Sequence, residues 1–222
     1  RPIHDPRETP MHDRVTSSID TTIAELIDVG RTAVERGLVL ASGGNLSARV
    51  EGERFVITGA GTWLDRLEPE QFTIMDLDGT RAGGAERPSS EWKLHQRSYR
   101  ARPDVNAVVH VHPQHAVLLD ALGHRVRLLT LDHAYYVKSI GRTAFHPNGS
   151  DELADTAAEQ AAQHDCIIMA HHGCSALGDS IEMAFRRAMN LEEAATTTFR
   201  ALQLGDADTV FPPAAFAALH HA

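Results

Sequence analysis

The segment Asn106-Ala107-Val108-Val109-His110-Val111-His112 decides how the rest of this chain is interpreted. Side chains alternate between the two faces of a strand, so His110 and His112 share one face in a strand over this segment. Val109 and Val111 then share the other face. Two neighbouring imidazoles at a strand end supply half of a coordination shell for a metal ion. Because chance alone gives about one such pair in a chain this rich in histidine, its meaning depends on residues elsewhere.

The composition suits one globular domain. The chain has 222 residues, of which 42% are hydrophobic, and this is enough to bury a sizeable core. A net charge of -9 without a basic cluster argues against a nucleic-acid partner. No apolar run is long enough to cross a membrane, and two cysteines cannot form a disulfide framework, which favours the cytoplasm. We predict a flexible N-terminal arm over residues 1–18 and a single domain over residues 19–222.

Hydrophobic spacing and capping residues predict helices over residues 19–36, 88–100, 115–122, 151–164 and 180–204. Strands are predicted over residues 45–49, 54–58, 72–76, 105–111 and 166–170, and residues 128–131 are expected to be extended. The turn at Asp78-Gly79 predicts a hairpin. Helices that alternate with hairpin-forming strands indicate a mainly antiparallel sheet covered by helices.

Two further residues extend the histidine pair into a candidate metal site. Glu91 lies at the start of a predicted helix, where a carboxylate also suits the helix dipole. His172 ends a predicted strand, and His171 competes with it because alternation lets only one of the two face the other ligands. Three imidazoles and one carboxylate suit Zn²⁺, Mn²⁺ or Fe²⁺. The candidate ligands are Glu91, His110, His112 and His172.

An anion pocket is predicted beside this site. Backbone N–H groups at glycine turns and at helix N-termini point towards bound anions, and hydroxyl groups add neutral donors. Gly43-Gly44-Asn45 and Ser89-Ser90 have these features. Each motif alone also fits an ordinary turn or helix cap. Their joint presence next to Glu91 favours the pocket.

Taken in order, the motifs of this chain resemble those of the class II aldolase/adducin family. The resemblance extends from about residue 19 to residue 204. The motifs are Gly44-Asn45-x-Ser47-x-Arg49, Ile57-Thr58-x-x-Gly61, Pro88-Ser89-Ser90-Glu91, Arg102-Pro103-Asp104-Val105, His110-x-His112 and His171-His172-Gly173.

The resemblance implies an α/β/α sandwich around a mostly antiparallel central sheet, and a homotetramer with active sites at subunit interfaces. It also implies one divalent metal ion per subunit, with zinc first and manganese or iron as alternatives. The implied metal ligands are Glu91, His110, His112 and His172. The implied substrate-binding residues are Gly44, Asn45, Gly61, Ser89 and Ser90. The implied catalytic residues are Glu91 and Tyr135, with Tyr136 or His133 as alternative proton donors.

The implied function is a divalent-metal-dependent lyase that cleaves a C–C bond of a hydroxy-carbonyl or carboxylate substrate through a metal-stabilised enediolate or carbanion. The first alternative is a decarboxylase of a non-phosphorylated hydroxy or aromatic acid. A sugar-phosphate 4-epimerase comes next, and a non-catalytic adducin-like binding module comes last. The retained metal-site histidines argue against the binding module.

Three departures from the family pattern bear on the substrate. Ala60 stands where aldolases of the family usually carry Thr or Ser, which removes one hydroxyl donor to a phosphate. Trp63 is bulkier than the residue usual there, and it equally suits a core or interface position. Both changes would suit a less charged or more planar substrate. The chain has no tyrosine after Tyr136, which argues against fuculose-phosphate aldolase activity of the usual kind.

Overall fold

The computed structural model describes residues 19–219, so the predicted arm over residues 1–18 lies outside the described residues. An eight-stranded sheet forms its centre, in the order β4-β3-β2-β1-β5-β8-β7-β6. All neighbouring strands are antiparallel except β6 and β7, which confirms the predicted sheet. The strands are β1 (Asn45–Val50), β2 (Arg54–Thr58), β3 (Phe72–Asp76), β4 (Arg81–Gly84), β5 (Ala107–Val111), β6 (Ile140–Thr143), β7 (Cys166–Met169) and β8 (Gly173–Gly178).

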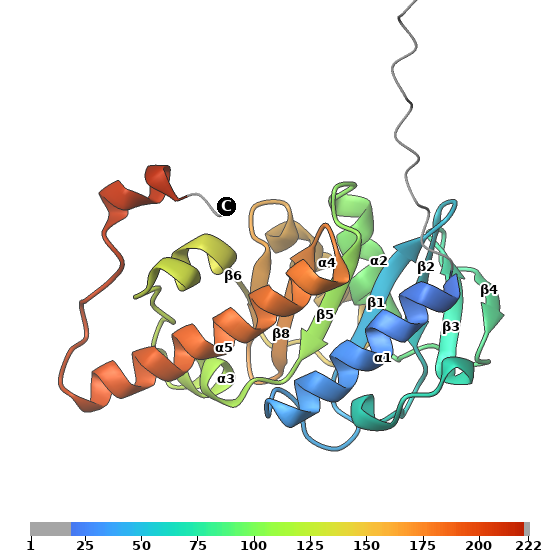
Figure 1. The fold of residues 1–222 in the computed structure, drawn as a ribbon, viewed down its shortest axis with the longest axis horizontal. Coiled ribbons are helices and arrows are strands. Elements are labelled where there is room, and N and C mark those ends of the chain that lie inside the picture. Colours follow the sequence, from blue (N-terminus) through green and yellow to red (C-terminus); the bar gives the residue numbers. More distant parts are fainter. Residues whose placement is uncertain (1–18, 220–222) are drawn as a thin grey trace, which may run out of the picture.

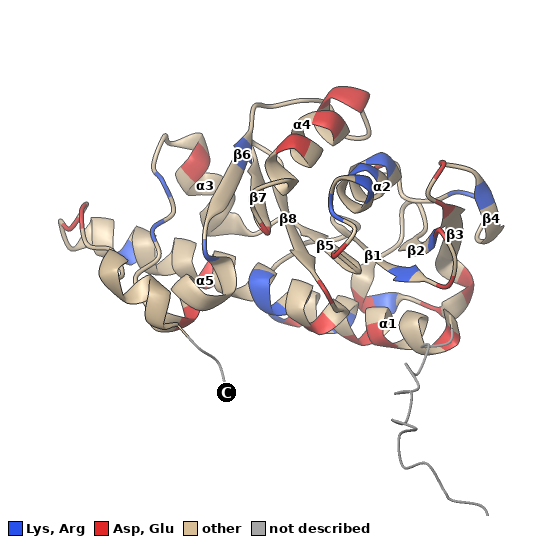
Figure 2. Ribbon diagram, turned by 90° about the horizontal axis from the view of Figure 1, so that it is seen from above, with Lys and Arg blue, Asp and Glu red and all other residues tan. Residues whose placement is uncertain are grey.

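Helices cover both faces of this sheet, as Figures 1 and 2 show. One layer contains α1 and α5, with α3 packed on α5, and the other contains α2 and α4. The fold is therefore an α/β/α sandwich. The helices are α1 (Ile19–Glu35), α2 (Trp92–Ala101), α3 (Gln114–Ala121), α4 (Asp151–Ala161) and α5 (Ile181–Gln203). The shorter helical turns are η1 (Leu64–Arg66), η2 (Pro69–Gln71), the π-helical η3 (His133–Val137) and η4 (Pro213–Ala218).

The alternation predicted for β5 is seen in its packing. Val109 and Val111 join the core beneath α1 and α5, whereas Val108 joins the core beneath α2 and α4. His110 therefore lies on the face of the sheet that α2 covers. Both cores exclude water, and their burial is the main stabilising contribution to the sandwich.

The hairpin predicted at Asp78-Gly79 is confirmed, because this turn joins the antiparallel strands β3 and β4. Three strands, β4, β6 and β8, have no counterpart among the predicted ranges. β8 contains Cys174 and pairs with both β5 and β7. β4 and β6 are edge strands rich in glycine or polar residues. Residues 128–131 form no strand, and the chain there runs without sheet pairing into η3. Within residues 19–219 no helix is both long and apolar enough to cross a membrane.

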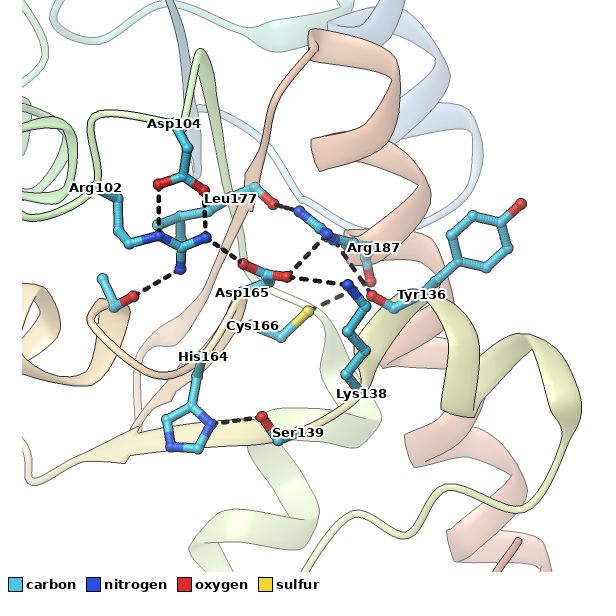
Figure 3. A network of polar contacts seen from close by, with 11 residues as sticks. Arg102, Asp104, Tyr136, Lys138, Ser139, His164, Asp165, Cys166, Leu177 and Arg187 are labelled. Atoms are coloured by element: carbon cyan, nitrogen blue, oxygen red, sulfur yellow. Dashed lines mark hydrogen bonds and ion pairs between the residues drawn. The ribbon is translucent and has the colours of Figure 1, made fainter. Parts of the chain in front are cut away.

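A network of ion pairs, which we call the Asp165 network, joins α2, β7 and α5 (Figure 3). The carboxylate of Asp165 lies 3.1 Å from a guanidinium nitrogen of Arg102 and 2.8 Å from one of Arg187. Arg102 also pairs with Asp104 at 2.8 Å. The Lys138 ammonium lies 4.0 Å from Asp165, so three cations surround this one carboxylate. The network fixes the start of β5 and β7 against the helices.

Candidate metal centre and substrate cavity

The structure brings the four candidate ligands into one cluster, with all four ligand atoms within 4.8 Å of one another. His110 Nε2 lies 3.1 Å from His112 Nε2 and 3.1 Å from Glu91 Oε2. His172 Nε2 lies 3.2 Å from Glu91 Oε1. His171, the competing candidate, is exposed and does not belong to the cluster. We call these four residues the metal cluster.

Backbone geometry explains how β5 and the turn before β8 place the imidazoles. His110 is the last but one residue of β5, and His112 follows the strand on the same face. His171 adopts a left-handed φ of 56°, which reverses the chain before His172. A Cβ at Gly173 would lie 2.6 Å from His112 Cδ2 and 3.2 Å from His110 Cε1. Only glycine therefore leaves room there for both rings.

The hydrogen bonds of His110 decide which nitrogen faces the cluster. Its Nδ1 lies 3.0 Å from the backbone carbonyl oxygen of Cys174. A carbonyl only accepts, so Nδ1 carries a proton, and in the neutral ring Nε2 presents a lone pair to Glu91. Two electron-rich atoms at this distance repel each other unless a proton or cation lies between them. Glu91 Oε1 is buried and makes no hydrogen bond within residues 19–219. This donor set fits a divalent cation.

The charge states of the cluster also favour metal binding. Burial raises the pKa of the Glu91 carboxyl, but in the metal-free protein the charge and hydrogen bonds of protonated His110 and His172 lower it by more, so the net pKa lies below its usual range. Burial lowers the pKa of His112 to about 3, with a further contribution from the charge of His110 and His172 when these rings are protonated. At neutral pH the glutamate is therefore ionised and His112 is neutral. Ionised carboxylate and neutral imidazole are the forms that coordinate metals.

A cavity of about 480 Å³ opens over the cluster. Its lining includes all five predicted substrate-binding residues: Gly44, Asn45, Gly61, Ser89 and Ser90. Gly44 has a φ of 75°, and a Cβ there would lie 2.8 Å from the carbonyl oxygen of His110. The glycine turn can therefore approach the end of β5 only without a side chain. Among the described lining residues none is Lys or Arg, so only neutral donors and imidazoles can hold an anion.

Two of these residues have contacts that the sequence did not predict. The side-chain amide of Asn45 donates from Nδ2 to Glu91 Oε2 at 2.9 Å, and its Oδ1 lies 2.5 Å from His95 Nε2. Its amide is therefore engaged with the cluster. Ser89 does not cap α2, because Glu91 occupies the N-cap position and Ser89 Oγ accepts from the Glu91 N–H at 3.3 Å. The Glu91 side chain makes no capping hydrogen bond and turns towards the histidines.

The structure gives no support to the substrate argument from Trp63. Its side chain is 42% exposed, lies under the guanidinium of Arg66 at 4.6 Å, and does not line the cavity. Thr62, which the sequence analysis passed over, does line the cavity, and its hydroxyl donates to the carbonyl oxygen of Gly59 at 3.0 Å. A hydroxyl is thus present two residues after Ala60.

Tyr135 does not line this cavity in its own chain. It lies half-buried in η3, and its ring packs edge-on against Tyr136 with centroids 5.0 Å apart. Of the alternative donors, His133 is buried and accepts the Leu129 N–H at Nδ1, while the Tyr136 hydroxyl accepts from Arg186 at 3.1 Å. The role of Tyr135 as proton donor stays a prediction, and it requires a neighbouring subunit.

Other residues that surround the site were not found from the sequence. Phe145, His146, Pro147 and Asn148 form one wall of the cavity. His95 lies behind Asn45 and is fully buried. Its four-residue spacing from Glu91 on α2 was the available signal, but such spacing is common for helix residues that face a core.

Comparison with known proteins gives matches over most of the chain. Residues 24–199 match the model of the Class II Aldolase and Adducin N-terminal domain. An L-fuculose phosphate aldolase of Methanocaldococcus jannaschii is 34% identical over 174 residues, which are 78% of this chain and 93% of that protein. A 3-oxo-tetronate 4-phosphate decarboxylase of Haemophilus influenzae is 29% identical over 179 residues, which are 78% and 85% of the two chains. A solved structure of an L-fuculose 1-phosphate aldolase has a TM-score of 0.84 at 27% identity, over 92% of this chain and 97% of that one.

Proposed function

Because this chain belongs to the class II aldolase and adducin family, we propose that it holds one zinc ion at the metal cluster and cleaves a C–C bond of a phosphorylated hydroxy-carbonyl compound. It is a lyase of this family, and a small molecule is its substrate. The observation that carries the proposal is the cluster of Glu91, His110, His112 and His172 on the floor of a cavity with neutral anion-binding groups.

The proposal of a phosphorylated substrate rests on the wall beside the cluster. Gly44 and Gly61 expose backbone there, and Ser89, Ser90 and Thr62 add hydroxyls. Such groups bind phosphate through N–H and O–H donors. Trp63 does not line the cavity and gives no support to a planar substrate. The names of the aldolase and decarboxylase relatives also refer to phosphorylated compounds.

A divalent cation at the cluster would polarise the substrate carbonyl and stabilise the negative charge that develops as the C–C bond breaks. The glycine turn and the serines hold the phosphate and so place the carbonyl above the histidines. Glu91 is ionised, and its Oε1 makes no hydrogen bond within the described part of the chain. This oxygen can therefore accept the proton of the substrate hydroxyl as the bond breaks. Tyr135 of a neighbouring subunit then returns a proton to the carbon.

The assembly and compartment are parts of the same proposal. Tyr135 lies outside the cavity of its own chain, so a donor role for it needs a second copy. A homotetramer with active sites between subunits, as the family resemblance implies, would supply it. Both cysteines, Cys166 and Cys174, are free and buried, which favours a reducing cytoplasm.

Decarboxylation is the second candidate, because the relative from Haemophilus influenzae is named as a decarboxylase. Loss of CO₂ leaves the same kind of negative charge next to a carbonyl as aldol cleavage does. The same residues would therefore serve both reactions. An epimerase would need further acid and base residues, and the sequence motifs identify none, while a binding module has no use for the cluster.

The test is metal analysis of the purified protein together with a turnover screen. The screen includes sugar phosphates, phosphorylated hydroxy acids, and non-phosphorylated hydroxy and aromatic acids. We expect one metal per chain and aldehyde release from a sugar phosphate. CO₂ release from a phosphorylated acid would select the decarboxylase. Activity restricted to non-phosphorylated acids would contradict the phosphate part of the proposal, and a metal-free, inactive protein would contradict all of it.

A further inference from the structure

A row of buried polar contacts leads away from Glu91 between β1 and α2. Every second residue of β1 faces α2 and contacts one residue there. The contacted residues of α2 are spaced four positions apart. Two residues of a strand span about 6.7 Å and four residues of a helix about 6 Å, so the two series stay in register. The β1 residues are Asn45, Ser47 and Arg49, and their partners on α2 are Glu91, His95 and Tyr99.

The contacts form a continuous chain of hydrogen bonds. Asn45 Nδ2 donates to Glu91 Oε2 at 2.9 Å, and Asn45 Oδ1 lies 2.5 Å from His95 Nε2. Ser47 Oγ lies 2.6 Å from His95 Nδ1 and 2.7 Å from the Tyr99 hydroxyl. All five residues are buried, with exposed fractions from 0 to 5%. Water therefore does not replace any partner in these hydrogen bonds, and each donor keeps its acceptor.

The carboxylate of Glu91 fixes the direction of every bond in this chain. Only the NH₂ group of Asn45 can face it, because the amide oxygen would repel it. Asn45 Oδ1 then needs a donor, so His95 carries its proton on Nε2. His95 Nδ1 is left as an acceptor for the Ser47 hydroxyl, whose oxygen accepts from Tyr99. All donors point towards Glu91, and His95 must be neutral.

The far end of the chain is anchored to the backbone. Arg49 donates to the carbonyl oxygens of Tyr99 and Val105 at 2.6 and 2.8 Å, and its guanidinium lies 4.9 Å from the centre of the Tyr99 ring. Tyr99 is fully buried and also packs against Phe55. The hydroxyl that begins the chain is therefore held by the core.

We propose that His95 is a positioning residue of the metal cluster. Its Nε2–H orients the Asn45 amide so that the NH₂ group holds the Glu91 carboxylate in place. His95 itself touches neither the cavity nor the cluster. The reaction that it serves rests on the proposed function, whereas the hydrogen-bond order does not. A histidine that merely fills the core would have no preferred tautomer and no effect on Glu91.

A pair of substitutions separates positioning from packing. His95→Leu keeps the bulk but removes both hydrogen bonds, and His95→Gln can still donate to Asn45 and accept from Ser47. Loss of partners that orient metal ligands commonly costs about 10- to 100-fold in metal affinity or activity. We expect that loss in the kcat of His95→Leu with little change in KM, and recovery to within about threefold in His95→Gln. His164→Leu is the matched control, because His164 bonds Ser139 outside the cavity and should leave kcat unchanged.

Nitrogen NMR of histidine-labelled protein tests the bond order without an activity assay. We expect His95 to be neutral with the proton on Nε2 in the metal-free and the metal-loaded protein. Ser47→Ala should change the Nδ1 signal, and Tyr99→Phe should change it less. A proton on Nδ1, or a charged ring at neutral pH, would overturn the proposal.

A failure of the proposed function would give a different experimental result from a failure of the positioning role. If the wild-type protein has no lyase turnover, the zinc dissociation constant replaces kcat as the readout. We then expect weaker binding by about 10- to 100-fold in His95→Leu and recovery in His95→Gln. Equal zinc affinity in the wild type and His95→Leu would overturn the positioning role.

Discussion

Two polar clusters flank β5, and they are built in opposite ways. The Asp165 network precedes the strand, and in it each carboxylate faces a guanidinium, as Figure 3 shows for Asp165 with Arg102 and Arg187. The metal cluster follows the strand, and there the Nε2 lone pair of His110 faces a carboxylate oxygen of Glu91. In the Asp165 network each charge has an opposite charge beside it, whereas in the metal cluster electron-rich atoms face one another.

This difference separates residues that stabilise the fold from residues that are arranged to bind a metal ion. Opposite charges that already face each other hold the helices to the sheet and need nothing more. Converging lone pairs at buried positions cost free energy unless a cation neutralises them. We therefore expect the Asp165 network to stabilise the fold without a ligand, and the metal cluster to acquire its full stability only with a bound ion.

The largest expected effect comes from breaking the metal cluster. His110→Ala and His112→Ala each remove an imidazole, and zinc affinity should fall by more than about 100-fold, beyond the usual cost of losing an outer partner. Elemental analysis and turnover of the purified variants check this. Full metal occupancy in both variants would contradict the site.

Acid should destabilise the metal-free protein in two different pH ranges, one set by buried histidines near the metal cluster and one set by the Asp165 network. Burial and the charge of His110 lower the pKa of His95 from 6.5 to about 3, so the unfolded chain binds a proton that the folded chain does not. The pKa of His112 is lowered to about 3 as well, so stability of the metal-free protein should be level above 6.5 and fall below it by up to about 1.4 kcal/mol per pH unit for each of these two histidines. The hydrogen bond from Arg102 lowers the pKa of Asp104 from 3.8 to about 2, so its contribution is present above 3.8 and is lost only as the pH falls towards 2.

Urea unfolding of metal-free protein over a series of pH values measures this dependence. His95→Gln should reduce the slope by about half above pH 3.8, because His112 still titrates in this range and Asp104 does not contribute there. An unchanged slope in this variant would show that other groups cause the acid loss.

Asp165→Asn should break the network without affecting the metal cluster. The Asp165 side chain is 13% exposed, and its loss leaves Arg102 and Arg187 without this shared partner. We expect a loss of about 2 kcal/mol in the free energy of unfolding, since a partly buried charge loses its pair. Guanidinium titration measures the stability, and zinc affinity should match the wild type. A change in zinc affinity would show that the two clusters are coupled.

The smallest effect is expected at an exposed ion pair. Glu182 pairs with Arg186 on the surface of α5, and both side chains are largely exposed. Glu182→Ala should cost less than about 0.5 kcal/mol, because water and salt screen such pairs. Thermal unfolding of this variant beside Asp165→Asn measures the contrast. An equal loss in the two variants would remove the distinction between network and surface pair.

Much of this arrangement was predicted from the sequence because local patterns specify it. Strand alternation placed His110 and His112 on one face, and the family motifs pointed to Glu91 and His172. Ser150, directly before the helix predicted from residue 151, caps α4 by accepting from the Leu153 N–H at 3.1 Å. Periodicity and capping act within a few residues, so one sequence shows them.

The features that were missed depend on contacts between distant segments. β8 consists mostly of small residues with a glycine at each end, and its pairing with β5 and β7 makes it a strand. Asn45 was predicted to bind the substrate, and its link to Glu91 becomes visible only when β1 lies against α2. The predicted role of Tyr135 depends on a contact that lies outside the chain altogether, because it needs a second subunit.

Calorimetric titration of the metal-free protein with zinc tests the central claim most directly. We expect one ion per chain for the wild type and for Asp165→Asn with equal affinity, and no measurable binding for His112→Ala. Absence of binding to the wild type, or undiminished binding to His112→Ala, would contradict the assignment of the metal cluster.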